Sequence, residues 1–567
     1  MSYLLSKFGV QSLLIEKYPE RLAAPKAHAL CPRSLEICRQ FGLDTTALRK
    51  MGTRRKDAYW VNFLTNLSGE RIGVLPYERM DIEVMDETPE MIHNVAQPDF
   101  EKFIASHLMY DSNVEVRKGV AFVSCRQENG VVTSTLEECH TKHQYTVRSR
   151  HVVGCDGAKS QVRNDLGIES EGEDSYETMM TIHFNADLRP VVKDRVGMLH
   201  WITDPACSGF IIAYDLSENQ VLINNFDPKR HPVGSWNADL ARKVVAAAIG
   251  HDVPFNVLSY RPWVLSRRVA NQYHVGNVLL AGDAAHSFPP TGGLGLNSGI
   301  ADVHNLAYKI ASVHQGRAGQ RILESYVEER RQIALVNSGQ SVENGKKIFS
   351  FLNTLGTAGI EDIEEARGNL HKSIHDPAKQ DLIKGQVEGQ REHFDNLEIH
   401  IGYVYGSKHA PSNASHYTPK LIPGARLPHA WIKLHDPTQI PDFKPVDVSY
   451  VEEWSNDEIF ARTASTLDLC HFNSFTVVVG SRDDWGRRYE ELQDLLRGRH
   501  IQVHLYALDA DFEFVFEKHR MLFKQGSNMM RGGAILVRPD QHILAIVEPR
   551  ASAAEILLVL LKHLCML

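Results

Sequence analysis

The stretch GNVLLAGDAAHSFPPTGGLGLN, residues 276–297, decides how this chain is expected to fold. Val278–Ala281 is an apolar strand that ends at Gly282 and Asp283. A small residue there lets a backbone approach closely, and a carboxylate accepts hydrogen bonds from hydroxyl groups. The glycine-rich turn that follows leads into a helix over about 297–313, whose first amides and dipole favour negative charge. A purely structural turn is the alternative, but the whole run favours a binding site.

A second stretch, VVGCDGAKSQVR at residues 152–163, again places a short apolar strand before a turn. Asp156 and Arg163 carry the charges needed to hold that turn and to approach a dinucleotide. A salt-bridged turn with a purely structural purpose is the competing interpretation.

The chain opens MSYLLSKFGVQSLLIEKYPE, which predicts a helix ending at Gly9 and a buried strand over Val10–Ile15. Glu16 and Lys17 lie at the tip of that strand, as in the second half of a nucleotide-binding βαβ unit. In such units the acidic residue follows the glycine fingerprint by about 20 residues. Glu16 has only 15 residues before it. We therefore expect the first strand and its G-x-G-x-x-G turn to lie upstream of Met1, as in a truncated gene product.

Together these stretches resemble the class A FAD-dependent aromatic hydroxylases, in particular the phenol 2-monooxygenase and chlorophenol monooxygenase branch. The resemblance implies an α/β fold: a Rossmann-type FAD-binding domain, here N-terminally truncated, a β-rich substrate lobe and a C-terminal thioredoxin-like domain. The expected boundaries are 1–177 and 266–400 for the FAD-binding domain, 178–265 for the β-rich lobe, 401–454 for a linker and 455–567 for the C-terminal domain.

The same resemblance assigns residues to FAD. Glu16 would accept hydrogen bonds from the adenosine ribose, with Lys17 beside it. Arg33, in AHALCPRSLE (27–36), would reach the phosphates, and Gln97, in VAQPDF (95–100), the ribityl chain. From the two motif stretches it adds Asp156, Asp283, Pro290, Gly293, Leu296 and Asn297.

The reaction implied by the resemblance uses NAD(P)H and O2 to hydroxylate a phenolic substrate through a flavin C4a-hydroperoxide. His28 is the candidate catalytic base, because an unperturbed imidazole titrates near neutral pH. The substrate is expected between the flavin and the 178–265 lobe. Trp201, Phe210 and Tyr214 are candidates for its lining, although aromatic residues in strands belong more often to a core.

The tail stretches PGARLPH (423–429), STLDL (465–469) and LVRPD (536–540) resemble the thioredoxin-like domain that many phenol hydroxylases of this family carry. The chain has no C-x-x-C pair, so we expect no thiol redox chemistry there. A role in packing or in forming a homodimer is the expectation that remains.

Composition narrows the other possibilities. The net charge of −8 predicts no general attraction to nucleic acid or anionic lipid. The eight cysteines are scattered, which predicts a reducing, cytoplasmic location and no metal site, and no apolar run is long enough to span a membrane. Two alternatives stay open: a non-hydroxylating FAD oxidoreductase, and an inactive remnant that binds a ligand or partner without FAD. A halogenase is disfavoured because the W-x-W-x-I type of motif is missing.

Overall fold

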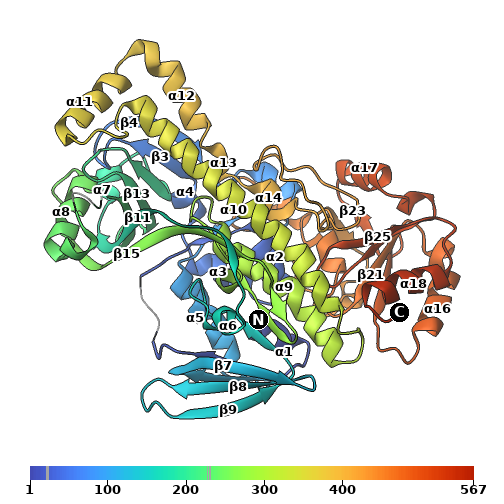
Figure 1. Ribbon diagram of the computed structural model, residues 1–567. Coiled ribbons are helices and arrows are strands. Elements are labelled where there is room, and N and C mark those ends of the chain that lie inside the picture. Colours follow the sequence, from blue (N-terminus) through green and yellow to red (C-terminus); the bar gives the residue numbers. More distant parts are fainter. Residues whose placement is uncertain (21–23, 227, 229–230) are drawn as a thin grey trace.

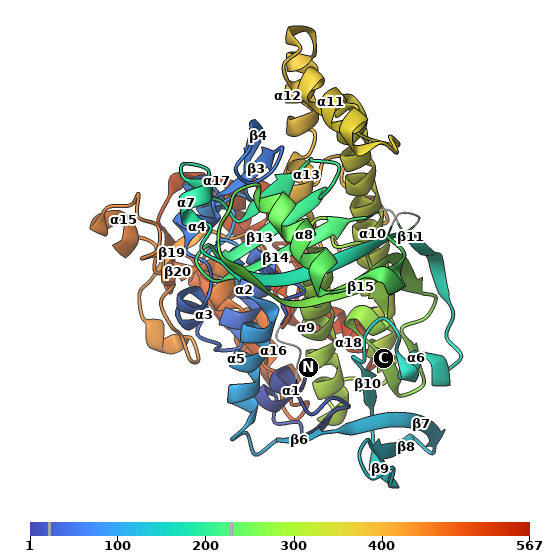
Figure 2. The same ribbon diagram turned by 90° about the vertical axis from the view of Figure 1, so that its left-hand side faces the viewer.

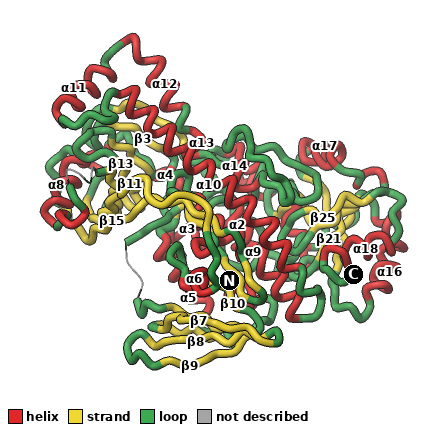
Figure 3. The backbone as a smooth tube through the Cα atoms, in the orientation of Figure 1, coloured by secondary structure: helices red, strands yellow, loops and turns green. Residues whose placement is uncertain are grey.

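The computed structural model describes residues 1–20, 24–226, 228 and 231–567 (Figure 1). Strands gather in three regions: around β7–β9 near the N-terminus, in the large sheet that includes β11, β13 and β15, and in the C-terminal part around β21 and β25 (Figure 3). Two long helices, α9 (Leu294–His314) and α10 (Ile322–Leu355), run through the middle of the molecule between these regions.

Two sets of parallel strands form the nucleotide-binding unit. β1 (Ser12–Glu16) pairs with β6 (Val114–Lys118), while β10 (Val152–Gly154) pairs with β17 (Val278–Leu280), which β16 (His274–Val275) extends. β1 is the predicted opening strand, shifted by two residues. The two sets are separate sheets, so one edge of β1 and one edge of β10 have no strand partner among the described residues.

The helices beside these strands begin near prolines or end near glycine. α1 (Ser2–Lys7) stops at Gly9, whose φ of 73° suits glycine. α2 (Pro32–Gln40) and α5 (Gln97–Leu108) both have proline in their first turn, where its missing N–H costs nothing. Helix α10 is fastened to β17 because the Tyr326 hydroxyl donates to the carbonyl oxygen of Leu280 at 2.7 Å.

An eight-stranded sheet forms the β-rich lobe, and it extends beyond the expected 178–265 segment. The hairpin at residues 60–76 forms one edge of this sheet. The expected boundary at residue 178 falls inside β11 (Ser170–Ala186). Helix α8 (Ala238–Ile249) packs on one face through Val245 and Ile249. The strand order is β18 (His286–Ser287), β15 (Phe255–Ala270), β11 (Ser170–Ala186), β14 (Asn219–Asn225), β13 (Gly209–Asp215), β12 (Leu199–Ile202), β3 (Trp60–Leu64) and β4 (Arg71–Pro76).

The C-terminal part has a four-stranded sheet with three helices. The first two strands are parallel, and the last two are antiparallel to their neighbours. The sheet order is β22 (Val503–Ala507), β21 (Phe475–Val479), β24 (Ala534–Val537) and β25 (Ile543–Val547), with helices α16 (Arg482–Leu496), α17 (Glu517–Gly526) and α18 (Ala553–His563).

The segment expected to be a linker, 401–454, is packed against the body of the protein. It contains β19 (Trp431–Leu434), which pairs with β20 (Ala464–Ser465) and β23 (Phe512–Phe514). The Trp431 indole is fully buried and donates to the carbonyl oxygen of Met85 at 2.7 Å. This segment therefore joins the two halves rigidly.

Buried charges hold the C-terminal domain against α9 and α10. Arg538 contacts both Glu329 and Asp540 at 2.6 Å, and Lys309 contacts Glu329 at 2.8 Å. Burial by itself would raise the pKa of Glu329, but Arg538 and Lys309 outweigh it and hold that pKa well below its usual range. Every charge in this interface has a partner of opposite sign. Removing one of them would leave a buried charge unpaired and lower the stability of the protein.

The remaining elements are short. A three-stranded antiparallel sheet projects from the body, and helices α11 and α12 project at the opposite end (Figures 1 and 2). Among the described residues, no helix is both long and apolar enough to cross a bilayer. These elements are β7 (Val120–Glu128), β8 (Val131–Glu138), β9 (Gln144–Ser149), β2 (Ala29–Leu30), β5 (His93–Asn94), α3 (Thr45–Met51), α4 (Arg55–Ala58), α6 (Gln161–Asp165), α7 (Arg189–Val192), α11 (Ile363–Ile374), α12 (Gln380–Glu388), α13 (Arg391–Phe394), α14 (Leu397–Ile401) and α15 (Asn456–Phe460).

Candidate active site

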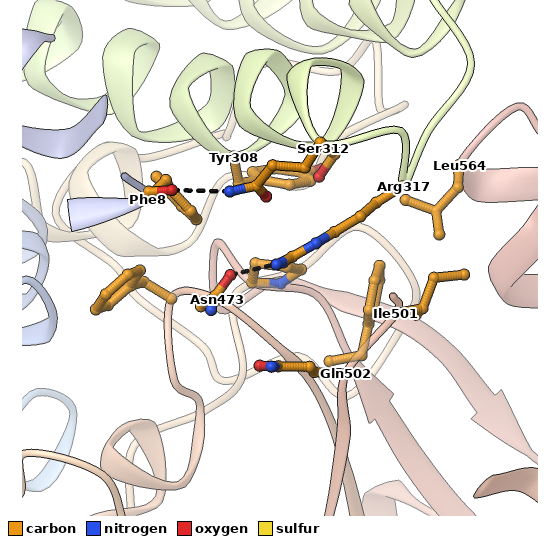
Figure 4. Close-up of a pocket in the computed structure, with 12 residues that line it drawn as sticks. Phe8, Tyr308, Ser312, Arg317, Asn473, Ile501, Gln502 and Leu564 are labelled. Carbon is orange, nitrogen blue, oxygen red and sulfur yellow. Dashed lines mark hydrogen bonds between the residues drawn. The ribbon is translucent and has the colours of Figure 1, made fainter. Parts of the chain in front are cut away.

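Two cavities differ greatly in what they can hold. The first lies between α9 and the C-terminal domain and measures about 20 Å³, with Gln315 donating to the carbonyl oxygen of Phe8 and Arg317 to the side chain of Asn473 (Figure 4). The second measures about 1440 Å³ and is lined by β1, β10, the 281–300 stretch and the large sheet. Pockets for one small ligand are usually about 300–1,000 Å³. Only the second cavity has room for a dinucleotide together with a substrate.

Hydrogen bonds from Asp302 fix the turn after β17, and Asp283 in that turn lines the cavity. The carboxylate of Asp302 accepts the amide of Gly282 at 3.0 Å, lies 2.6 Å from the His286 Nε2 and accepts the Arg330 Nε at 2.8 Å. Burial would raise the pKa of Asp302, but His286 and Arg330 hold it below its usual value. Asp283 itself lines the cavity, and burial raises its pKa against the pull of His286.

The start of α9 is open to the same cavity. Gly293 is the N-cap, with φ of 64° and no side-chain cap, so the first amides of a 21-residue helix are left for a ligand. A Cβ added at Gly293 would meet only Glu78 and Ala29, at 3.8 and 3.9 Å. Pro290, Gly293 and Leu296 line the cavity, as the resemblance implies for a flavin ring.

Asn297 fastens this turn to α2. Its amide group donates to the carbonyl oxygens of Ala29 and Gly293, both at 2.9 Å. Its oxygen accepts the amide of Cys31 at 3.0 Å and the hydroxyl of Ser34 at 2.7 Å. Because these bonds use the whole carboxamide, Asn297 positions the turn and has no polar atom to spare for a cofactor.

Of the three residues expected near the adenosine and ribityl parts of FAD, Glu16 and Gln97 line the cavity and Lys17 does not. Glu16 ends β1 and lines the cavity, and one of its oxygens accepts the amide of Tyr18 at 2.9 Å. Gln97 also lines it and donates to Glu101 at 2.8 Å. Lys17 is exposed and lies over the ring of Tyr18, 4.9 Å from its centre, with its side chain outside the cavity.

Arg33 is placed away from the expected phosphate position. Its guanidinium donates to Glu36 at 3.0 Å, to Gln541 at 2.7 Å and to the carbonyl oxygen of Asp540 at 2.8 Å. The side chain is 2% exposed. Arg33 therefore points into the C-terminal domain, and in this conformation it cannot reach a phosphate in the cavity.

Asp156 is likewise turned to the protein. Its carboxylate accepts the amides of Gln161 at 2.7 Å and Val162 at 3.1 Å, together with the hydroxyl of Ser160. It thereby satisfies the first amides of α6, which is the structural alternative that the sequence left open. Arg163 donates to the carbonyl oxygen of Ala284 at 2.9 Å and so ties the two motif stretches together.

His28 lies in the cavity wall, on the loop before β2. Its Nδ1 is 2.8 Å from the Asn94 Oδ1, and its ring stacks on Tyr77 and meets the edge of Tyr214. With Nδ1 donating to Asn94, the Nε2 atom is left as an acceptor. Burial lowers the pKa of His28 to about 4, against the effect of the Asn94 hydrogen bond. The imidazole is therefore neutral at physiological pH, whereas an unperturbed histidine would be partly protonated.

Glu78 is a candidate functional residue that no motif in the sequence indicated. It follows β4 with φ of 42°, is buried, and lines the cavity beside Gly293. Its Oε2 has no hydrogen-bond partner among the described residues. Burial and then the charge of Asp395 raise the pKa of Glu78 well above its usual value. A buried carboxyl with a raised pKa, held in strained backbone beside a ligand cavity, is typical of a functional group.

The substrate end of the cavity has an apolar wall. Of the three aromatic candidates, Phe210 lines the cavity, while Trp201 and Tyr214 are buried behind the surface. Trp201 stacks on Phe63 with ring centres 5.3 Å apart. The apolar lining of the strands and of α13 comprises Leu199, Phe210, Ile212, Ile223, Trp263 and Phe394.

Comparison with known proteins identifies the family and the fold. The chain is similar to the 2,4-dichlorophenol 6-monooxygenase of Delftia acidovorans (26% identity over 573 residues, 95% of this chain and 91% of that protein). It is similar to the phenol 2-monooxygenase of Pseudomonas sp. (strain EST1001) at 26% identity, covering 95% of this chain and 86% of that protein. Among solved structures, the flavin-dependent monooxygenase PieE in complex with FAD and substrate matches all of this chain and 96% of its own, with a TM-score of 0.87 and 23% identity, which establishes the fold. Because the family model described as FAD binding domain matches residues 1–338, more than half of the sequence, the chain belongs to that family.

Proposed function

We propose that this protein is an FAD-dependent monooxygenase that hydroxylates a phenolic or other aromatic substrate with NAD(P)H and O2. The observation that carries the proposal is one large cavity in which Asp283, the uncapped start of α9 and His28 all meet. Relatives that cover most of the chain are named as monooxygenases of phenol and of dichlorophenol. The overall reaction adds one oxygen atom of O2 to the ring and releases the other as water, with NAD(P)H supplying the two electrons.

The residues present fit FAD. Asp283 lines the cavity and offers a carboxylate to the ribityl hydroxyls, and Glu16 offers an acceptor at the tip of β1. The amides at the start of α9 suit the negative charge that a reduced isoalloxazine carries. When bound, FAD supplies the redox chemistry, taking a hydride from NAD(P)H and activating O2. The protein residues supply position and a dry, apolar wall.

His28 and Glu78 are the groups that we assign to the substrate end. The free Nε2 of His28 accepts the hydrogen bond of a phenolic hydroxyl and takes its proton as the ring becomes electron-rich. The raised pKa of Glu78 favours its protonated form, in which the carboxyl donates a hydrogen bond without adding a negative charge near the ring. Its placement beside Gly293 and within the same cavity supports this role.

We further infer that full FAD binding needs one more parallel strand between β1 and β10. The open edges of these two strands support it, as does the cavity, which Leu14 of β1 and Cys155 after β10 both line. A strand there would lead into the glycine turn that places pyrophosphate on a helix N-terminus. The order β22-β21-β24-β25 likewise supports a thioredoxin-like fold for the C-terminal domain.

The experiment that tests the function combines an absorbance spectrum with turnover. Purified protein mixed with FAD should show bound-flavin absorbance, consume NAD(P)H when a suitable phenol is added, and yield a product that is heavier by one oxygen atom. NAD(P)H consumption with peroxide alone would favour a non-hydroxylating oxidoreductase. Protein that stays colourless after FAD is added would favour the remnant and overturn the proposal.

A further inference from the structure

Two histidines and a glutamate meet at the surface, far from the cavity residues described above. His371 and His375 are one helical turn apart on α11 and its C-cap, and Glu70 lies in the turn between β3 and β4. One ligand atom from each of the three lies within 4.8 Å of the other two. His375 Nε2 is 2.9 Å from the Glu70 Oε2, and His371 Nδ1 is 3.4 Å from the Glu70 Oε1.

The hydrogen bonding of His375 leaves a free nitrogen aimed at Glu70. Its Nδ1 lies 2.8 Å from the carbonyl oxygen of His371, which can only accept, so Nδ1 carries the proton. The Nε2 atom is the ring nitrogen that remains for another partner, and it faces the Glu70 carboxylate at 2.9 Å. This backbone bond is also the contact that commonly orients a metal-binding histidine.

The spacing of the ligand atoms suits a transition metal. Two atoms bound to one zinc ion at about 2.0–2.2 Å lie about 3.0–3.5 Å apart in tetrahedral or octahedral geometry. The two measured separations, 2.9 and 3.4 Å, are close to that range. Two imidazoles and a carboxylate favour zinc or a similar borderline divalent ion over magnesium or calcium, which prefer oxygen ligands.

We propose that Glu70, His371 and His375 form a zinc-type metal site that clamps α11 to the β3–β4 turn. α11 and α12 also touch other parts of the large sheet: Arg367 of α11 pairs with Asp204, just after β12, at 2.8 Å, and Val387 of α12 packs on Gly73 of β4. α11 and α12 project from the body (Figure 2), and their buried side chains Leu370, Ile383 and Val387 belong to the same hydrophobic cluster as Phe351 and Leu355 of α10. The metal fixes this projecting arm to the sheet whose other strands line the large cavity.

The test is zinc binding to the full-length protein, measured by isothermal titration calorimetry after dialysis against a chelator. We expect one zinc equivalent to be lost, or its affinity to fall by at least about tenfold, in His375→Ala and in Glu70→Gln. His409→Ala removes an exposed histidine elsewhere and should keep wild-type binding. Lys372→Ala, on the same helix, controls for effects on α11 itself.

A second readout is thermal unfolding with and without ZnCl2. The metal should raise the melting temperature of the wild type and of the two control variants, and leave His371→Ala/His375→Ala unchanged, because only the native state presents the three ligands together. Equal zinc stoichiometry and affinity in the wild type and the double variant would overturn the proposal. So would a wild type that binds no zinc. Neither result depends on FAD binding or hydroxylation.

Discussion

The carboxylate of Asp302 accepts the backbone amide of Gly282 at 3.0 Å while it pairs with Arg330 at 2.8 Å. A buried ion pair between α9 and α10 thus fixes the conformation of the turn that presents Asp283. We expect Asp302→Asn to lower the free energy of unfolding by about 3–5 kcal/mol, because Arg330 would be left buried and unpaired. FAD affinity should fall with it. Urea unfolding and flavin titration measure both, with the exposed Asp381→Asn as control; equal values for both variants would contradict the assignment.

Asp283 and Asp156 should respond differently to the same change. Asp283→Asn removes a cavity carboxylate and should weaken FAD binding by about tenfold, with little change in melting temperature. Asp156→Asn weakens the cap of α6 and should cost about 1 kcal/mol of stability, with FAD affinity of the folded protein unchanged. Paired flavin titrations and thermal melts decide. A larger loss of FAD affinity in Asp156→Asn would restore it as a cofactor ligand.

The raised pKa of Glu78 predicts how the stability of the folded protein depends on pH. Since its folded pKa is raised above 4.5, the folded protein binds more protons than the unfolded chain once the pH exceeds that value. Its contribution to stability is therefore present at low pH and is lost as the pH rises through the unfolded value towards the folded one. Glu78→Gln should be more stable than wild type by a margin that grows between pH 5 and pH 8, as thermal melts would show. A margin independent of pH would mean that Glu78 is ionised.

His28 should affect hydroxylation more than cofactor reduction. His28→Ala is expected to lower the rate of phenol hydroxylation by about 10²-fold or more, while NAD(P)H still reduces the bound flavin. Because the pKa of His28 is about 4, it stays neutral from pH 5 to pH 8 and its protonation should not shape the rate there. Stopped-flow reduction and product analysis separate the two steps. Equal loss in both would point to a positional role.

The open edges of β1 and β10 predict that an added strand improves FAD binding. We expect a fusion that places an apolar strand and a G-x-G-x-x-G turn before Met1 to raise FAD affinity by about tenfold or more, because pyrophosphate gains a helix N-terminus. The matched control is the same fusion with valine in place of each glycine. Indistinguishable FAD affinity in the fusion, its control and the original chain would refute this account.

Local signals predicted the secondary structure at the centre of the candidate site. The run of residues 276–297 contains its own strand, turn and helix start, so Asp283 and Gly293 could be placed from neighbouring residues alone. Strand direction has no comparable local signal: polarity alternates over Val114–Val116, as in many antiparallel strands, yet β6 runs parallel to β1. Alternation reports which face is buried, and it carries no information on strand direction.

The misplaced residues depend on partners that are distant in the chain. The Arg33 guanidinium binds Asp540 and Gln541, about five hundred residues away, and no local pattern announces that contact. Asp156 has its partners within six residues, and there the cap of α6 competes with the cofactor for the same carboxylate. Glu78 was missed because its function rests on burial and on an unusual φ, neither of which a sequence displays.

The ion cluster between Glu329 and Arg538 also decides how this chain could be recombined with its relatives. Both charges are almost fully enclosed, and each belongs to a different half of the protein. A hybrid joined anywhere between α10 and β24 would set Arg538 against whatever a foreign partner offers at the position of Glu329. Successful exchange must therefore move Lys309, Glu329 and the C-terminal domain as one inherited unit, however far apart they lie along the gene.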